Sequence, residues 1–304
     1  MARVTTFSNA TWGRCVLAGL LACTALAAPA FAQDPAAPQS PPAQDPAAGQ
    51  PPPAQADPDA RVDPLQPDFN LAALPTTLRM PAHKFDFRVT HRFTRSLGRG
   101  DLGDLFADFF GFDSGAQIGL ELRYGLVKSN QIGVHRTSDR TIQIFDQQSV
   151  WQQRDGHPLG LDAIVTLEGT NNMRDQLSSA LGVLASRKVG GIVALYAEPT
   201  YMVNTRPATS NDPDNDTFML GLGGRIRIRP VVYLVGEITP RLWGYQPGEA
   251  QASFGIEIRS GGHLFQINVS NGFGTTLGQL AHNGGIDFGQ HSWFLGFNIA
   301  RKFF

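Results

Sequence analysis

From about His83 to the last residue, the sequence repeatedly alternates apolar and polar residues with a period of two. Phe85, Phe87 and Val89, for example, alternate with Asp86 and Arg88. This pattern predicts β-strands with one apolar and one polar face, because successive side chains of a strand point to opposite sides. Such segments lie near 85–93, 117–124, 130–138, 140–152, 159–169, 177–187, 190–199, 217–229, 231–243, 251–259, 262–270 and 292–304. We therefore expect an all-β body of about 12 strands.

The links between these segments alternate in length. Short links at 128–130, 154–158, 188–190, 230 and 260–262 alternate with links at 96–114, 138–140, 170–176, 205–216, 244–250 and 271–291, most of which are longer. Transmembrane barrels have short periplasmic turns and longer external loops, whereas a soluble sandwich has no reason to sort its loops in this way. The pattern predicts an antiparallel transmembrane β-barrel over residues 76–304, with both ends of the chain on the short-turn side.

Prolines and aromatic residues fit the same arrangement. Pro199 and Pro240 would interrupt the middle of a strand ladder, but here they are expected at the outer ends of strands. Aromatic side chains are expected in two girdles at the membrane surfaces. The outer girdle comprises Tyr201, Trp243 and Trp293, and the inner girdle Trp151, Phe303 and Phe304.

The polar faces of the predicted strands carry many charges, which would face a lumen because charges facing lipid are costly. The candidates for lumen or constriction residues are Arg88, Glu121, Arg123, Arg225, Arg227, Arg229, Glu237, Arg241, Glu257 and Arg259. A barrel of this size has room for a narrow water-filled lumen or for one crossed by ion pairs. Residues 101–112 carry apolar residues at helical spacing and are expected to form a surface helix over the barrel mouth, or else an inward plug.

Residues 1–32 have the pattern of a secretory signal peptide. Arg3 and Arg14 give a positive start, an apolar core follows, and Ala30-Phe31-Ala32 is a small-x-small cleavage pattern. Leu20 to Cys23 resembles a lipobox, which leaves lipidation of Cys23 as an alternative. Because Cys15 and Cys23 are the only cysteines, the mature chain would have no disulfide and no thiolate chemistry.

Residues 33–75 are expected to be a disordered Pro/Ala-rich periplasmic linker. The stretch to about Pro67 consists mainly of Pro, Ala, Gln, Asp and Gly, and lacks an apolar face that would offset the entropy of ordering. A plain tether is the favoured interpretation, and an arm that contacts the cell wall or a partner is the alternative. The formal net charge of −1 and the lack of a basic patch argue against nucleic-acid binding.

No catalytic or metal motif is evident, and neither a cofactor nor enzymatic activity is expected. His282 and His291, in one long loop, are the best catalytic or metal candidates among the seven histidines. Asp212, Asp214 and Asp216 begin like a calcium loop, but Thr217 and Gly223 stand where the motif needs Gly and Glu. The expected reading is a solvated acidic loop.

The body resembles an uncharacterised family of predicted bacterial outer-membrane β-barrels, a domain of unknown function. The segments AQIGLELRYGL, QIGVHRTSDRTIQIF, SNGFGTTLGQL and WFLGFNIARKFF carry this resemblance over roughly 80–304. It implies a Gram-negative outer-membrane location, with outer-membrane lipid and the barrel-insertion machinery as partners, but no chemistry. Arg301 and Lys302 depart from the usual closing strand, where an apolar residue is expected.

Three functions remain open from the sequence. A passive, porin-like channel would use Arg225, Arg227, Arg229 and Arg241 as a constriction that favours small polar or anionic solutes. A closed barrel would act as a structural or envelope-interaction protein. A lipid-modifying barrel enzyme is the remote third alternative.

Overall fold

The computed structural model describes residues 62–304, except the side chains of Arg154 and Gln290. The predicted signal peptide and residues 33–61 of the predicted linker lie outside the described residues. Within residues 62–304, no helix is both long enough and apolar enough to span a membrane.

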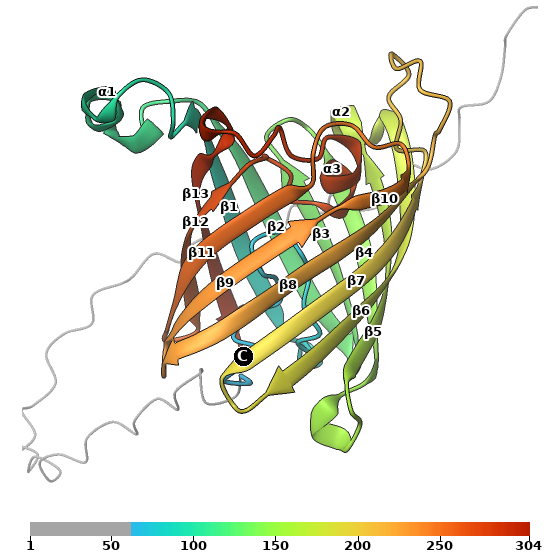
Figure 1. Cartoon of the computed structure of the whole chain (residues 1–304). Helices are drawn as coiled ribbons and strands as arrows, with labels where there is room; N and C mark the ends of the chain where they lie inside the picture. The colour runs from blue at the N-terminus through green and yellow to red at the C-terminus, as the bar shows by residue number, and fades with distance from the viewer. Residues whose placement is uncertain (1–61) are drawn as a thin grey trace, which may run out of the picture. The chain divides into compact units, whose positions relative to one another are not determined.

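The described chain is an antiparallel β-barrel (Figure 1). Consecutive strands pair with one another, except that β10 pairs with β8 and β9 pairs with β11. Because β1 pairs with β13 and β8 with β9, the sheet closes on itself. The strands are β1 (Phe85–Ser96), β2 (Ala116–Val127), β3 (Asn130–Thr137), β4 (Ile142–Trp151), β5 (Gly160–Gly169), β6 (Asp175–Val189), β7 (Val193–Val203), β8 (Thr217–Arg229), β9 (Val232–Thr239), β10 (Arg241–Gly244), β11 (Gln251–Ser260), β12 (His263–Ser270) and β13 (Phe294–Phe303). Closure pairs both edges of the strands that span the wall, as lipid requires because it offers no hydrogen bonds to free backbone groups.

The strand prediction is confirmed segment by segment. The structure counts 13 strands because the predicted strand 231–243 is divided at Pro240 into β9 and β10, which both pair with β8. These two pieces occupy one position in the wall, so the barrel wall has 12 strands. Pro199, in contrast, lies within β7, where the β6–β7 pairing skips from Gly182↔Thr200 to Ala185↔Ala197. The ladder thus has a gap where proline has no N–H to donate.

The predicted sorting of connections is also present. The connections that Figure 1 draws at the lower end join β2 to β3, β4 to β5, β6 to β7, β8 to β9, and β11 to β12. The opposite end carries α1 (Leu102–Ala107), η2 (Phe109–Gly111), α2 (Thr170–Met173), α3 (Leu277–His282) and η4 (Gln290–Ser292), whereas η3 (Gln153–Asp155) is in the β4–β5 turn. We call these the short-turn end and the long-loop end.

The helix predicted within 101–112 exists, but it does not cover the mouth. Figure 1 shows α1 beside the long-loop end, outside the barrel wall, and none of its residues is buried. Leu102 and Phe106 are exposed, whereas Phe112 packs on Phe93 of β1 with ring centroids 4.6 Å apart. The expected placement over the mouth is therefore wrong, because the contact between Phe112 and Phe93 holds this segment against the outer wall.

The outer wall is apolar and the inner wall is polar, as the alternation predicted. In β11, Phe254, Ile256 and Ile258 are about half exposed, whereas Ser253 and Glu257 are buried on the inner side. In β13, Gly296 and Asn298 face inward, and Leu295 and Phe297 face outward. This is the orientation that a lipid-facing wall requires.

A charge on the outer wall should destabilise the barrel. Ile256 lies midway along β11, opposite Leu234 and Ile267 of the neighbouring strands. We expect Ile256→Arg to lower the free energy of unfolding in lipid vesicles by about 2–4 kcal/mol, measured by urea titration. The control Ile286→Arg, at an exposed loop residue, should change it by less than about 0.5 kcal/mol. Equal effects of the two variants would contradict the placement of this wall in lipid.

Candidate functional site: the filled lumen

Residues 62–80 form a hairpin inside the barrel, which we call the plug hairpin. Figure 1 shows it as the blue thread within the wall, leading into β1. Its tip is closed by hydrogen bonds from Leu71 N to Leu74 O (2.7 Å) and from Thr76 N to Phe69 O (2.7 Å). The linker predicted to extend to residue 75 is therefore corrected: residues 65–75 are buried in the lumen, where side chains of the wall bond to several of their backbone groups.

The amide groups of the hairpin tip converge on one carboxylate of the wall. Ala72 N, Ala73 N and Leu74 N donate to the Glu237 carboxylate of β9 at 2.9–3.1 Å. Three consecutive N–H groups around one carboxylate form a small anion-binding nest. Each hydrogen bond to a charged acceptor contributes about 1.5–3 kcal/mol, so Glu237 is a principal anchor of the tip.

The carbonyl groups of the tip meet a set of donors from β1, β12 and β13. Ala72 O accepts from three side chains and Leu71 O from two. The donors are Arg88 Nη2 (2.7 Å to Ala72 O, 3.3 Å to Leu71 O), Arg92 Nη2 (3.3 Å to Ala72 O), Asn298 Nδ2 (3.0 Å to Ala72 O) and Gln266 Nε2 (3.2 Å to Leu71 O). We call Arg88, Arg92, Gln266 and Asn298 the donor cluster.

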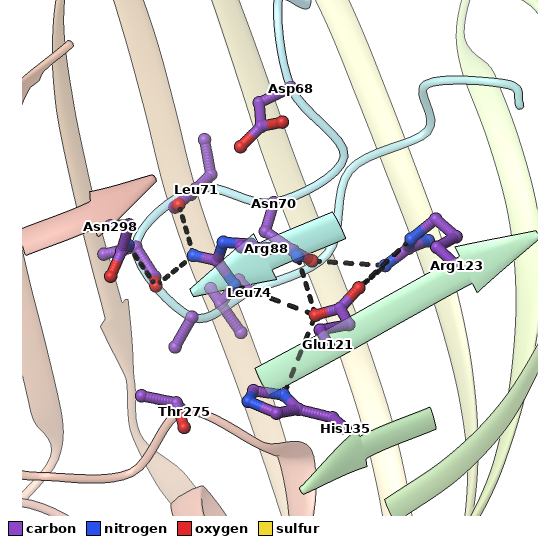
Figure 2. Close-up of polar contacts among 12 residues, drawn as sticks. Asp68, Asn70, Leu71, Leu74, Arg88, Glu121, Arg123, His135, Thr275 and Asn298 are labelled. Atoms are coloured by element: carbon purple, nitrogen blue, oxygen red, sulfur yellow. Dashed lines mark hydrogen bonds and ion pairs between the residues drawn. The ribbon is translucent and has the colours of Figure 1, made fainter. Parts of the chain in front are cut away.

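Beside this cluster, Glu121 of β2 organises a charged network (Figure 2). The Glu121 carboxylate accepts from Arg123 Nη2 at 2.9 Å and from Asn70 Nδ2 of the hairpin at 3.1 Å. It also lies 3.8 Å from Arg88 Nη1 and 3.7 Å from His135 Nδ1. One carboxylate thus serves several cationic or donor groups, and all of them are buried.

Ion pairs fasten the hairpin at the short-turn end. Lys188 Nζ of β6 lies 2.6 Å from Asp63, and Lys302 Nζ of β13 lies 2.9 Å from Asp68. Lys302 and Asp68 are both almost fully buried. This pairing explains the atypical end of the closing strand: Lys302 points into the lumen, whereas Arg301 lies on the other face and contacts His263 and the ring of Phe303.

Glycines of β8 make room for the apolar side chains of the hairpin. A Cβ at Gly223 would lie 2.3 Å from Leu71 Cδ1, and one at Gly221 would lie 2.8 Å from Leu74 Cδ2. Leu71 and Leu74 join a buried apolar cluster with Leu65, Ala73 and residues of the wall. The inner face of β8 is therefore shaped for this hairpin.

A second element, α3, closes the lumen near the long-loop end. The Glu168 carboxylate of β5 accepts from Gly278 N at 3.1 Å, and Arg241 Nη1 of β10 donates to Leu280 O at 3.1 Å. The helix thus meets a negative side chain near its N-terminus and a positive one near its C-terminus, as its peptide dipoles favour. Leu277 and Leu280 complete the apolar cluster that contains the hairpin tip.

Between the hairpin and α3, a cavity of about 20 Å³ adjoins Asn70, Glu121, Arg123 and His135. This volume holds about one water molecule. The described lumen is accordingly filled at this level, and no solute larger than water fits there.

The structure pairs only some of the predicted lumen residues with one another. Arg225 Nε lies 2.5 Å from Glu257, and Arg225 Nη2 also donates to Asn70 O at 2.9 Å. Glu237 and Arg241 have separate roles: Glu237 holds the hairpin and Arg241 holds the α3 loop. Arg227 and Arg259 are partly exposed and Arg229 is exposed, on the part of β8 and β11 nearest the short-turn end.

The proposed girdle residues lie mostly on the outer surface. Tyr201 and Trp243 stack at 6.4 Å between ring centroids, and Trp293 lies 6.0 Å from Phe254. At the short-turn end, Trp151 stacks on His157 and Phe303 on Phe85. Phe304 instead packs against the buried cluster of Val62, Phe69, Leu78 and Met80 in the hairpin.

The histidine pair does not form a common site. His282 Nδ1 lies 2.5 Å from Thr205 O and its Nε2 lies 3.2 Å from Ser178 Oγ, whereas His291 is exposed in η4. In the acidic loop, Asp216 accepts from Tyr201 Oη at 2.7 Å and from Asn204 N at 3.0 Å. Within residues 62–304, no group of three or more His, Cys, Asp or Glu side chains is arranged to hold a metal ion.

The plug hairpin was not predicted from the sequence, and neither were Gln266 and Asn298 as partners of its tip. Arg88 and Arg92 were expected on the inward face of the first strand. One signal was present: Leu65, Phe69, Leu71, Leu74 and Leu78 give residues 65–80 more large apolar side chains than the Pro/Ala-rich stretch before them. Gln266 and Asn298 gave no signal, because a polar residue on the inner face of a barrel strand is expected everywhere.

These features define a membrane-bound β-barrel whose lumen is filled by its own N-terminal segment. Residues 68–303 match the family described as membrane-bound beta barrel domain, DUF5777, and the chain belongs to this family. The resemblance inferred from the sequence is thereby confirmed. The match includes most of the hairpin, which begins six residues earlier.

Several solved structures are similar to this chain at low sequence identity. An outer membrane channel from Pseudomonas putida F1 has a TM-score of 0.48 and 11% identity, with 74% of this chain and 97% of that chain covered. The NanC porin has a TM-score of 0.47 and 9% identity, with 72% of this chain and 99% of that chain covered. Omp33 of Acinetobacter baumannii has a TM-score of 0.43 and 7% identity, with 73% of this chain and 98% of that chain covered. No curated protein matches the sequence. At these scores no functional argument rests on the similarities.

A larger side chain at Gly223 should displace the hairpin tip. Gly223→Val places methyl groups where Leu71 now packs, so hydrogen exchange of the amides of residues 71–76 should accelerate at least about tenfold, measured by mass spectrometry. The matched control is Gly224→Val, on the opposite face beside Leu195. Unchanged protection in Gly223→Val would show that the tip does not depend on this glycine.

Acid should loosen α3 through His282. Burial lowers the pKa of His282 from its ordinary value of 6.5, partly offset by the hydrogen bond with Thr205 O. The folded state therefore favours the neutral ring. The stability that the neutral ring contributes to the folded protein is lost as the pH falls below the ordinary pKa of 6.5. Between about pH 7 and about pH 5, we expect faster exchange of the α3 amides, after correction for intrinsic rates. This dependence should vanish in His282→Gln and persist in the control His291→Gln.

Proposed function

We propose that the protein is a gated channel of the Gram-negative outer membrane for small polar or anionic solutes, held closed by the plug hairpin. The observation that carries this proposal is the polar inner wall that the hairpin covers. A permanently filled barrel would be filled at lower cost by apolar packing than by buried charges. A wall suited to water is, in contrast, what a conducting state requires.

The charges along the hairpin favour anions. The basic side chains of the wall that it contacts are Arg88, Arg92, Arg123, Arg225, Lys188 and Lys302. The acidic ones are Glu121, Glu237 and Asp155. Over the whole inner wall, further buried acids (Asp86, Asp162, Glu198 and Glu257) offset these bases, so the preference for anions would be local to the surface that the hairpin covers.

The direction of withdrawal follows from the topology. Barrels of the outer membrane place their short turns in the periplasm. The ion pairs of Asp63 and Asp68, and β1 itself, attach the hairpin at the short-turn end. The hairpin would thus leave toward the periplasm, the side on which the preceding N-terminal segment is also expected.

A permanently closed structural barrel is the second candidate. The apolar cluster that joins the hairpin, the wall and α3 favours it, because withdrawal exposes Leu71, Leu74 and Leu277. Locking the hairpin distinguishes the two candidates.

Locking should abolish conductance. Thr77 Oγ1 and Ser186 Oγ lie 2.5 Å apart, so Thr77→Cys with Ser186→Cys would link the hairpin to β6 by a disulfide. No other cysteine follows the predicted signal peptide. In planar bilayers we expect stepwise conductance from the native chain, its loss in the oxidised double variant, and its return on reduction.

Thr77→Cys alone is the matched control and should conduct under both conditions. The Gly223→Val chain should open more often than the native chain. If neither the native chain nor Gly223→Val conducts, the channel proposal fails and the closed barrel stands.

A further inference from the structure

The donor cluster carries more positive charge than its partners in the hairpin can balance. Arg88 and Arg92 are exposed by only 1% and 0%, and they lie on the same face of β1. Arg92 has no carboxylate within ion-pair distance among residues 62–304. Its partners are His91 O, Ala72 O and Asn298 Oδ1, at 2.9–3.3 Å. Buried charges with only neutral partners are costly.

Arg88 is only slightly better compensated. Its nearest carboxylate, Glu121 at 3.8 Å, is engaged more closely by Arg123 at 2.9 Å. Within the described chain, Arg88 Nε and Arg92 Nε have no hydrogen-bond acceptor. Two buried guanidinium groups thus retain unused donors beside the hairpin tip, and Glu237 balances only part of the Arg92 charge, from beyond ion-pair distance.

The arrangement fits a charged oxygen ligand better than it fits peptide carbonyls. Two guanidinium groups and two side-chain amides direct N–H donors toward one region, now occupied by Leu71 O and Ala72 O. Arginine binds carboxylate and phosphate oxygens through strong, charge-assisted hydrogen bonds. The hairpin tip therefore occupies, with neutral oxygens, a place that an anion would fill more favourably.

We propose that Arg88, Arg92, Gln266 and Asn298 form an oxyanion-binding site of the open lumen, for solutes that carry a carboxylate or phosphate group. The carbonyls of Leu71 and Ala72 occupy this site in the closed state, and such a solute displaces them. This inference rests on the proposed channel and names its solute class. A ligand that binds only after the tip has left shifts the equilibrium toward the open state.

The full-length protein tests this by hydrogen exchange of residues 71–76. The salts are inorganic phosphate, succinate and chloride, each at about 20 mM and adjusted to equal ionic strength. An oxyanion at about ten times its dissociation constant should accelerate exchange about tenfold relative to chloride. Acceleration by phosphate alone assigns phosphate-bearing solutes, and acceleration by succinate alone assigns carboxylates. Equal exchange in all three salts overturns the proposal.

Variants identify the site. Arg92→Gln keeps a donor near Ala72 O but removes the charge, so the oxyanion effect should be lost. The control Arg227→Gln removes an arginine from the inner face of β8 outside the cluster and should keep the effect.

If Arg92→Gln does not fold, Asn298→Asp supplies the second test. Its carboxylate would occupy the site permanently beside Arg92 Nη1, which now donates to Asn298 Oδ1 at 2.9 Å. A full oxyanion effect in the folded site variant overturns the assignment.

Conductance recorded in the same salts separates this site from the channel proposal. If oxyanions accelerate exchange of the tip but no variant conducts, the site stands and the channel proposal fails. If the reducible lock controls conductance but exchange does not respond to oxyanions, the channel stands and the site fails.

Discussion

The structure depends on the closed ladder of backbone hydrogen bonds, because a sheet in lipid cannot leave an edge unpaired. Once β1 pairs with β13 and β8 with β9, every strand has a lipid side and a lumen side. Apolar residues occupy the lipid side and charged residues occupy the lumen side. The charges then need partners, and the chain supplies many of them from its own N-terminal hairpin. Membrane insertion and lumen filling are thus two results of one constraint.

The wall was predictable from the sequence because its signal is local and repeated. A period of two along segments such as 117–124 reports the strand, and the alternating link lengths report the two ends of the barrel. The break at Pro240 was not predicted, although proline cannot donate to the ladder. The atypical Lys302 was visible in the sequence as well, but its explanation was not, since its partner Asp68 is 234 positions away.

The filling of the lumen was not predictable in the same way. Residues 62–75 have no periodic face, and their order comes from the groups of the wall around them, such as Glu237 and Arg88. Many of these contacts join positions more than 100 residues apart, as for Ala73 with Glu237 and Thr77 with Ser186. A charge ladder such as Arg225, Arg227 and Arg229 shows which face is inward, but not whether water, a carboxylate or a peptide carbonyl meets it.

The short connection between the hairpin and β1 determines how strongly the hairpin competes with any solute. Only residues 81–84 separate them, and four extended residues span about 14 Å. A displaced tip would remain close to the opening at an effective concentration in the millimolar range. Reclosure is then unimolecular and does not depend on how much protein is present. To keep the lumen open, a solute would need a ratio of concentration to dissociation constant that exceeds the same ratio for the tethered hairpin.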